Sequence, residues 1–135
     1  NNMDVIEMAR ELGKELQKDE RYHVYLTAKK LNDEDEELQG MIGQFNLKRI
    51  QISSASSKPE PDQARIQQLQ ADLGDLYTKI MRNENMLNFE VAKQELDTLV
   101  TQVTQIVMRS ANGENPDEID LSSCTGSCST CGGCG

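Results

Sequence analysis

The spacing of apolar residues between positions 62 and 82 most constrains the fold. These residues recur at alternating intervals of three and four: Ile66, Leu69, Leu73, Leu76 and Ile80. This heptad spacing places apolar side chains along one side of an α-helix. A matching series follows between residues 86 and 110: Phe89, Ala92, Leu96, Leu99, Val103 and Ile106. Because only residues 83–85 separate the two series, we expect two long helices that pack as an antiparallel hairpin.

Shorter periodic stretches precede this hairpin and indicate an all-α protein of about five helices. We expect them at residues 3–18, from an N-cap at Asp19 to about residue 31, and from about residue 35 to 50. A linker rich in serine and proline is expected at residues 53–61. Within it, Ser57 and Glu60 have the spacing of a capping box for the next helix.

Composition limits what this helical body can bind. The chain has 135 residues, no tryptophan and five aromatic residues, so its core should be thin. The extra valines beside the last seam, Val100 and Val107, predict burial against the earlier helices and another subunit, in a homodimer or higher oligomer.

The formal net charge of −9 argues against direct binding of nucleic acid or anionic lipid. No apolar run approaches the roughly 20 residues of a membrane span.

All four cysteines of the chain lie within its last dozen residues. Cys124, Cys128, Cys131 and Cys134 are separated only by glycine, serine and threonine. Cysteine is usually buried, but this segment has no apolar residue with which to bury itself. The start of the chain, Asn1 to Asp4, has no features of a secretory signal, which predicts the cytoplasm. Thiols stay reduced there, and clustered cysteines bind metal more often than they form disulfides.

Four thiolates satisfy either tetrahedral zinc or a [4Fe–4S] cluster. Gaps of two and three residues resemble bacterial ferredoxin spacing more than a zinc ribbon, although the fourth cysteine of such a run serves a second cluster in ferredoxins. The spacing alone leaves iron–sulfur and zinc open. Two further alternatives are a thiol-redox carrier and a flexible tail that binds no physiological metal.

The linker before the cysteines, residues 111–123, contains the helix-stop signals Gly113 and Pro116. Thirteen extended residues reach at most roughly 40 Å, so the tail can lie well away from the helical body. Ile119 and Leu121 are the expected anchors. We therefore divide the chain into a helical domain, residues 3–110, and a linker with an irregular, metal-binding Cys/Gly-rich tail, residues 111–135.

Other residues give no sign of catalysis. His23 is the only histidine and lies among charged residues, so we expect it at the surface. The acidic run at 33–37 lacks the glycine and ligand spacing of an EF-hand and suits the positive end of a helix dipole. No phosphate-binding glycine loop, nucleophile elbow or HExxH motif is present. We expect no enzymatic activity.

Several segments, read together, resemble the YlbF/YmcA family. They are Met3–Leu12, Asp19–Tyr22, Asp35–Leu38 with Phe45, and Asn88–Leu96. The ending Leu121-Ser-Ser-Cys124, followed by glycine-spaced cysteines, resembles the YlbF branch in particular. The resemblance spans about residues 3 to 134.

This resemblance implies a small helical regulator without enzymatic activity. Family members associate with one another, as YlbF-like and YmcA-like chains, and with a YaaT-like partner in a complex that carries [4Fe–4S] clusters. That complex promotes messenger RNA processing by a membrane-attached endoribonuclease and so affects competence, sporulation and biofilm formation. By this resemblance Cys124, Cys128, Cys131 and Cys134 are candidate cluster ligands. The chain departs from the family pattern in having four closely spaced cysteines, which leaves open whether one chain holds a cluster alone.

Overall fold

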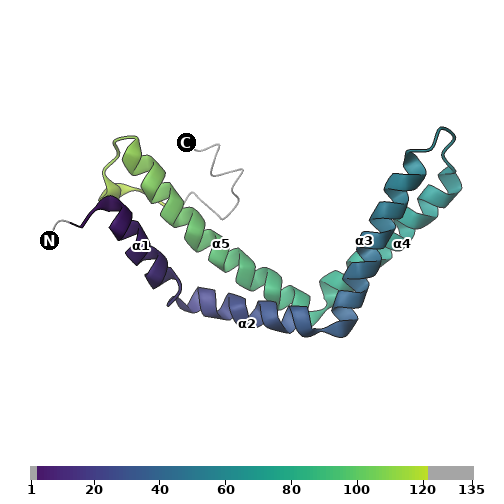
Figure 1. Cartoon of the computed structure of the whole chain (residues 1–135), viewed down its shortest axis with the longest axis horizontal. Coiled ribbons are helices and arrows are strands. Elements are labelled where there is room, and N and C mark those ends of the chain that lie inside the picture. Colours follow the sequence, from purple (N-terminus) through teal and green to yellow (C-terminus); the bar gives the residue numbers. More distant parts are fainter. Residues whose placement is uncertain (1–2, 122–135) are drawn as a thin grey trace. The chain divides into compact units, whose positions relative to one another are not determined.

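The computed structural model describes residues 3–121, and over this range the chain is all-helical (Figure 1). It confirms the predicted fold class. Five α-helices are followed by one short 3-10 helix, η1. Their bounds are α1 Val5–Leu16, α2 Glu20–Glu34, α3 Glu36–Ser56, α4 Gln63–Arg82, α5 Glu84–Ala111 and η1 Pro116–Glu118. None of the helices within these residues combines the length and the apolar character that crossing a membrane requires.

The chain divides into two compact units that do not follow the order of the helices. One unit is the continuous segment Thr27–Phe89 and contains α3 and α4. The other combines the residues up to Leu26 with those from Glu90 onward, so it contains α1 and most of α5. Helices α2 and α5 each contribute residues to both units. The first of these units is called the hairpin unit below, and the second the terminal unit.

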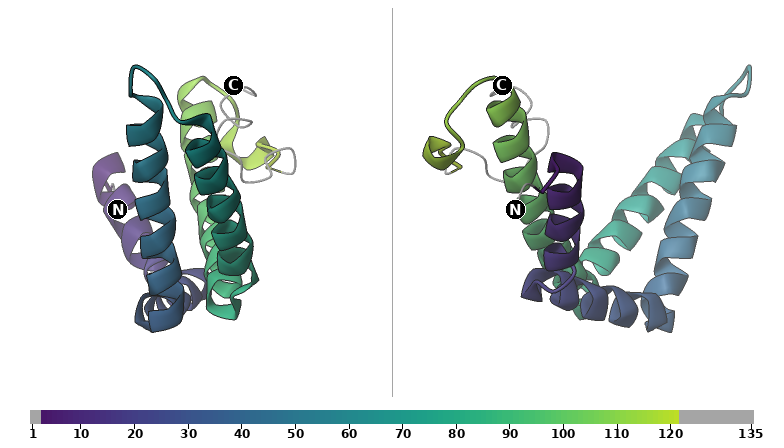
Figure 2. Two further views of the ribbon diagram at one scale, coloured as in Figure 1. Left: turned by 90° about the vertical axis from the view of Figure 1, so that its right-hand side faces the viewer. Right: turned by 60° about the vertical axis from the view of Figure 1, so that its left-hand side comes forward.

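An antiparallel hairpin of α3 and α4 forms the hairpin unit (Figures 1 and 2). The two helices contact each other along their length, and residues later in α3 contact residues earlier in α4. The rings of Phe45 and Tyr77 lie 6.3 Å apart between centroids. Three residues on along α3, Lys48 Nζ lies 3.8 Å from Asp72 Oδ2. The chain reverses direction in the intervening loop, whose prolines cannot continue α3.

The structure therefore confirms a long antiparallel helical hairpin, but the predicted pairing of its arms is wrong. The sequence paired residues 62–82 with residues 86–110, whereas the helix that packs along α4 is α3. The reason is the length of α3. This helix continues to Ser56 and has 21 residues, nearly the same as the 20 residues of α4. Serines at 53–56, expected in a linker, are helical because half-buried Ile52 and Ala55 continue the apolar side of the helix.

Burial within the hairpin unit confirms the predicted seam of α4. Leu69 is 1% exposed and Leu38, at the start of α3, is fully buried. The other buried apolar side chains of this unit are Ala28, Ile66 and Ile80. These residues form the described part of the core, since the terminal unit contributes only Ala92 and Thr101 to the buried set.

Aspartates rather than serines begin the helices. Asp35 and Asp62 are the N-caps of α3 and α4, and their carboxylates accept hydrogen bonds from Leu38 N at 2.9 Å and Arg65 N at 3.1 Å. The capping box predicted at Ser57 and Glu60 is wrong. Ser57 instead ends α3, where its hydroxyl donates to Ser53 O at 2.8 Å, which leaves the prolines outside both helices.

Helix α1, in the terminal unit, presents its apolar side to solvent. Val5, Ala9, Leu12 and Leu16 lie along one side of the helix, yet no residue of α1 is buried. Val5 is 75% exposed, and Ile6, Met8 and Leu12 are also exposed. Much of this apolar surface is therefore still in contact with water in the single chain.

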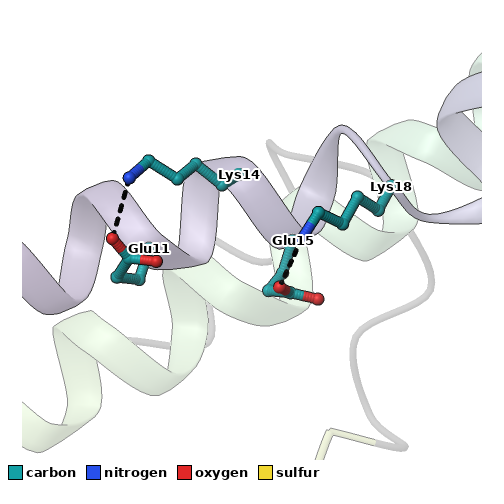
Figure 3. A network of polar contacts seen from close by, with 4 residues as sticks. All are labelled: Glu11, Lys14, Glu15 and Lys18. Carbon is teal, nitrogen blue, oxygen red and sulfur yellow. Dashed lines mark hydrogen bonds and ion pairs between the residues drawn. The ribbon is translucent and has the colours of Figure 1, made fainter.

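Two exposed ion pairs lie away from this apolar side (Figure 3). Lys14 and Lys18 form ion pairs with Glu11 and Glu15 at 2.9 and 3.2 Å, and all four side chains are more than half exposed. Exposed pairs of this kind contribute only about 0.3–0.5 kcal/mol each. They stabilise the helix slightly but do not hold α1 against anything else, so any force that fixes α1 must come from its apolar side.

Leu38 offers the sharpest test of the hairpin core. Replacing this fully buried side chain, Leu38→Ala, should lower the free energy of unfolding by about 2–5 kcal/mol because it leaves a cavity. Gly40→Ala, two residues along the same helix, is the matched control. A Cβ at Gly40 meets open space, so this change should raise the free energy of unfolding by about 1 kcal/mol. Urea denaturation followed by circular dichroism measures both, and equal effects would contradict the packing described.

Candidate functional site

The four predicted metal ligands, Cys124, Cys128, Cys131 and Cys134, lie outside the described residues. Between residues 3 and 121 no group of three or more histidine, cysteine or acidic side chains is placed to hold a metal ion. The described structure bears on that run through the segment leading to it, residues 109–121.

The C-terminus of α5 is closed by a Schellman motif. Gly113 has a φ of +95°, the left-handed region that suits glycine. Gly113 N donates to Ser110 O at 3.0 Å, and Glu114 N donates to Arg109 O at 3.1 Å. These two bonds satisfy carbonyl groups that have no partner inside the helix. The predicted stop signal at Gly113 is confirmed, and Pro116 begins η1 as a second stop.

One side chain, Arg109, holds the linker folded beyond this motif. Its guanidinium donates two hydrogen bonds to the Glu114 carboxylate, from Nε to Oε2 at 2.9 Å and from Nη2 to Oε1 at 2.6 Å. Its Nη1 also donates to the backbone oxygen of Asp120 at 3.2 Å, eleven residues further along the chain. The hydrogen bonds from Arg109 lower the pKa of Glu114, so this carboxylate stays charged at neutral pH. We call this arrangement the Arg109 clamp.

The clamp keeps the described part of the linker from being fully extended. Up to residue 121 the chain is instead folded over the end of α5 by η1 and Arg109. Ile119 and Leu121, the expected anchors, are half-buried. The polar anchor was missed, although a signal was present: Arg109 and Glu114 occupy the two Schellman positions that usually share an apolar contact, on either side of a glycine.

A second polar cluster lies in the hairpin unit, around the carboxylate of Asp35. Besides capping α3, Asp35 accepts hydrogen bonds at Oδ2 from Asn83 Nδ2 at 3.1 Å and from Asn85 Nδ2 at 3.0 Å. Asn83 is the break between α4 and α5, and its own Oδ1 accepts from Met86 N at 3.0 Å. One carboxylate thus joins two helix junctions that are distant in sequence.

Buried Asn32 extends this cluster. Its side-chain amide donates to Met86 Sδ at 3.4 Å, while Gln39 Nε2 donates to Asn32 O at 2.8 Å and to Asn32 Oδ1 at 3.1 Å. Every polar group of the Asn32 side chain therefore has a partner, as burial demands. Because its amides and carboxylate are engaged with one another, we assign this cluster a structural role.

The junction between α1 and α2 uses the same kind of cap. Asp19 accepts from Arg21 N at 2.8 Å and from the guanidinium at 2.9 and 2.8 Å, which confirms the predicted N-cap. These hydrogen bonds, first that of the Arg21 side chain, lower the pKa of Asp19 to about 2. The nearby His23 is exposed, as expected, with its ring edge-on to Tyr22 at 5.8 Å.

Asp35 gives a pH-dependent test of the hairpin unit. Hydrogen bonds from Leu38 N, then Asn83 and Asn85, lower its pKa below 3.8, so its contribution to stability is present above that value and is lost as pH falls through the lower folded-state pKa. Asp35→Asn should lower the melting temperature by several degrees at neutral pH, because its amide nitrogen would face two other donors. The difference from the original protein should shrink as the pH falls further below 3.8. Thermal melts at both pH values measure this, and a pH-independent difference would contradict it.

The chain was compared with known proteins at the level of family, sequence and structure. Residues 5–112 match the family described as "Control of competence regulator ComK, YlbF/YmcA". No significant match was found among curated proteins or among solved structures. The family match covers α1 to α5 and ends just before Gly113, so the linker and the cysteine run follow it in sequence. The chain belongs to the YlbF/YmcA family of regulators.

Proposed function

We propose that this protein is a cytoplasmic, non-enzymatic adaptor that ligates a [4Fe–4S] cluster through Cys124, Cys128, Cys131 and Cys134. Its helices bind protein partners, including copies of itself and YmcA-like and YaaT-like chains. In that assembly it promotes messenger RNA processing by an endoribonuclease without contacting RNA itself. Competence, sporulation and biofilm formation are the processes that this activity would control.

The observation that carries this proposal is a helical body of a regulatory family followed at once by four thiols. The family match ends at residue 112, and the described linker ends three residues before Cys124. The intervening residues, folded by the Arg109 clamp, connect the two. A helical body with exposed apolar faces and a separate ligand-bearing segment is the arrangement expected of an adaptor.

The donor set fits an iron–sulfur cluster. Thiolate sulfur is a soft ligand suited to iron–sulfur clusters, zinc and copper(I), and four thiolates complete the outer coordination of one [4Fe–4S] cluster. The short glycine-rich gaps allow successive sulfurs to converge. The same donor set completes a tetrahedral zinc site, so a helical oligomerisation module with structural zinc is the second candidate.

Regulation would follow from the coupling of the tail to the assembly. When bound, the cluster supplies an oxidation-sensitive link among the four thiolates. The chain's own part is to supply those four thiolates from one short segment that follows the linker. Partners that recognise the cluster-bound tail would then bind the protein that carries the cluster and not the protein without it.

Self-association is supported by the apolar side of α1. Four of its apolar side chains, Val5, Ile6, Met8 and Leu12, are exposed on a helix without a buried residue. Burial of one such aliphatic side chain contributes about 1.5–3 kcal/mol. Exposed valines of α5, Val91, Val100 and Val107, add to the apolar surface of the same unit. A second copy that covers these side chains would supply the burial that the thin terminal unit lacks.

The metal is tested by anaerobic purification with iron, sulfide and zinc measured together. We expect iron and acid-labile sulfide in equal amounts and the visible absorption of a cluster. Truncation after Ser123 should remove both and leave the helical circular dichroism nearly unchanged, since α5 ends at Ala111 and η1 at Glu118, both before the cut. A protein in which all four cysteines are replaced by serine is the full-length control. Zinc without iron would support the second candidate, and absence of both metals would refute metal binding.

Association is tested on the apolar side of α1. Leu12→Glu should shift the protein towards a monomer in sedimentation velocity experiments, because it places a charge where a second copy would bind. Its effect on helicity should be small, since Leu12 is exposed in the single chain. Arg10→Glu places the same carboxylate on the opposite side of α1 and is the matched control. A monomer at every concentration of the unmodified protein would contradict self-association.

A further inference from the structure

The side of α3 that faces away from α4 carries a second seam. Phe45 and Lys48 mark the side that contacts α4. On the opposite side, small and aliphatic residues recur at alternating intervals of three and four, the heptad spacing of a helix that packs on another helix. They are Gly40, Gly43, Leu47, Ile50 and Ser54, and we call them the outer seam of α3.

The outer seam is open to solvent in the single chain. Leu47 is 46% exposed and Ile50 is 66% exposed. Among the described residues, a Cβ added at Gly40 or Gly43 would meet no neighbouring group within 4 Å. A surface groove of about 420 Å³ is lined by Asn46, Arg49, Ile50 and Ser53. Small residues beside an exposed aliphatic pair allow another helix to approach closely.

Charge indicates that the occupant of this seam is a second copy of the chain. Between residues 38 and 57 the only charged residues are Lys48 and Arg49, and neither belongs to the seam. The chain has a net charge of −9, so two copies repel each other where their acidic surfaces meet. Single exposed aliphatic residues are ordinary, but they do not account for a whole helical side without charge. Along this side two copies can meet without that repulsion.

Gln51, on the flank of the outer seam, gives an independent indication of a partner. Its amide oxygen, Oε1, is buried and has no hydrogen-bond partner among the described residues. Buried polar atoms are almost always paired, because an unpaired one lowers stability. Rotation of this amide brings it to the flank of the seam. There Gln44 of a second copy, which lies one heptad earlier on the same flank, can donate to it.

Charge also decides the direction in which two seams pair. The acidic run at residues 33–37 precedes the seam, whereas the first charged residue after the seam is Lys58. A parallel pair would bring two acidic runs together, which like-charge repulsion opposes. An antiparallel pair sets each acidic run beside the Ser/Pro loop of the other copy and also opposes the two helix dipoles.

The register of the antiparallel pair follows from the symmetry of the seam. Its intervals are symmetric about the point midway between Leu47 and Ile50. A two-fold axis at this point sets Leu47 of one copy against Ile50 of the other. It also sets Gly43 against Ser54, so large side chains meet at the centre and small ones towards the ends. Both copies then use the same surface, as an isologous dimer requires.

We propose that the outer seam of α3 is a docking surface for a second copy of this chain, bound antiparallel through Leu47 and Ile50. This inference rests on the self-association proposed above and adds a second surface, separate from the apolar side of α1. One helix from each copy, in contact over roughly 26 Å, makes a small interface, so this dimer should dissociate at micromolar concentrations. With two such surfaces on each chain, the unmodified protein should form assemblies larger than a dimer.

Disulfide cross-linking tests the register, in full-length protein whose four native cysteines are replaced by serine. Gly43→Cys combined with Ser54→Cys should give a covalent dimer on mild oxidation, because the two positions face each other across the two-fold axis. Ser54→Cys alone should give at least about tenfold less, since its two copies lie roughly 16 Å apart along the pair, beyond the reach of a disulfide. A covalent dimer from Ser54→Cys alone would indicate parallel pairing and overturn the proposal.

A matched pair of variants tests the energetics in the Leu12→Glu background, where the apolar side of α1 carries a charge. Leu47→Glu should raise the dissociation constant of the dimer at least about tenfold, because it replaces apolar burial at the centre of the seam by a charge. Leu87→Glu is the control. Leu87 is also 46% exposed and belongs to the same unit but lies off the seam, so the constant should not change. Sedimentation equilibrium measures both constants.

The outcomes separate this inference from the self-association on which it rests. If the unmodified protein associates but neither the cross-link nor the effect of Leu47→Glu is found, the outer seam is overturned and the α1 surface stands. If the cross-link forms while Leu12→Glu leaves the assembly unchanged, the outer seam stands and the α1 surface is refuted. A monomer at every concentration refutes both. Equal weakening by Leu87→Glu also overturns the outer seam, because the effect would then reflect added charge alone.

Discussion

The hairpin unit depends on one carboxylate that serves two helix junctions. Asp35 caps α3 through Leu38 N and at the same time binds the side-chain amides of Asn83 and Asn85. At one end of the hairpin, the loop between α3 and α4 joins the two helices covalently. At the other end nothing covalent joins α3 to the end of α4, and these hydrogen bonds take that role. Fully buried Leu38 lies beside them, so the polar cluster and the apolar core support each other.

The pattern of apolar residues predicted the helices well but did not predict which helices pair. The seam of α4, including Leu69 and Ile80, is buried as its heptad spacing indicates. Heptad spacing defines a side of a helix, however, and says nothing about its partner, because any apolar side of similar length can cover it. Helix α3 pairs with α4 because the last turns of α3, through Ile52 and Ala55, continue its apolar side past the serines that had suggested a linker.

Helix caps were predicted correctly at Asp19 and wrongly at Ser57, because spacing alone does not decide between neighbouring candidates for a cap. Asp19 was recognised as a cap because an acidic residue directly precedes a periodic stretch. Ser57 had equally good spacing for a capping box, yet Asp62 lies closer to the first turn of α4 and competes for the same role. Of the candidate site, the cysteine ligands follow from residue type and spacing, and they remain a prediction. The Arg109 clamp could not be found by spacing alone, since its third bond joins residues eleven apart across an irregular segment.

The two units divide the requirements of an adaptor between them. The hairpin unit contains nearly all of the buried apolar side chains and can hold its shape through Asp35 and the α3–α4 seam. The terminal unit buries little, exposes the apolar side of α1, and carries the folded linker that leads to the cysteines. A unit that is incomplete by itself gains stability when a partner covers it, so binding and order are linked by mass action.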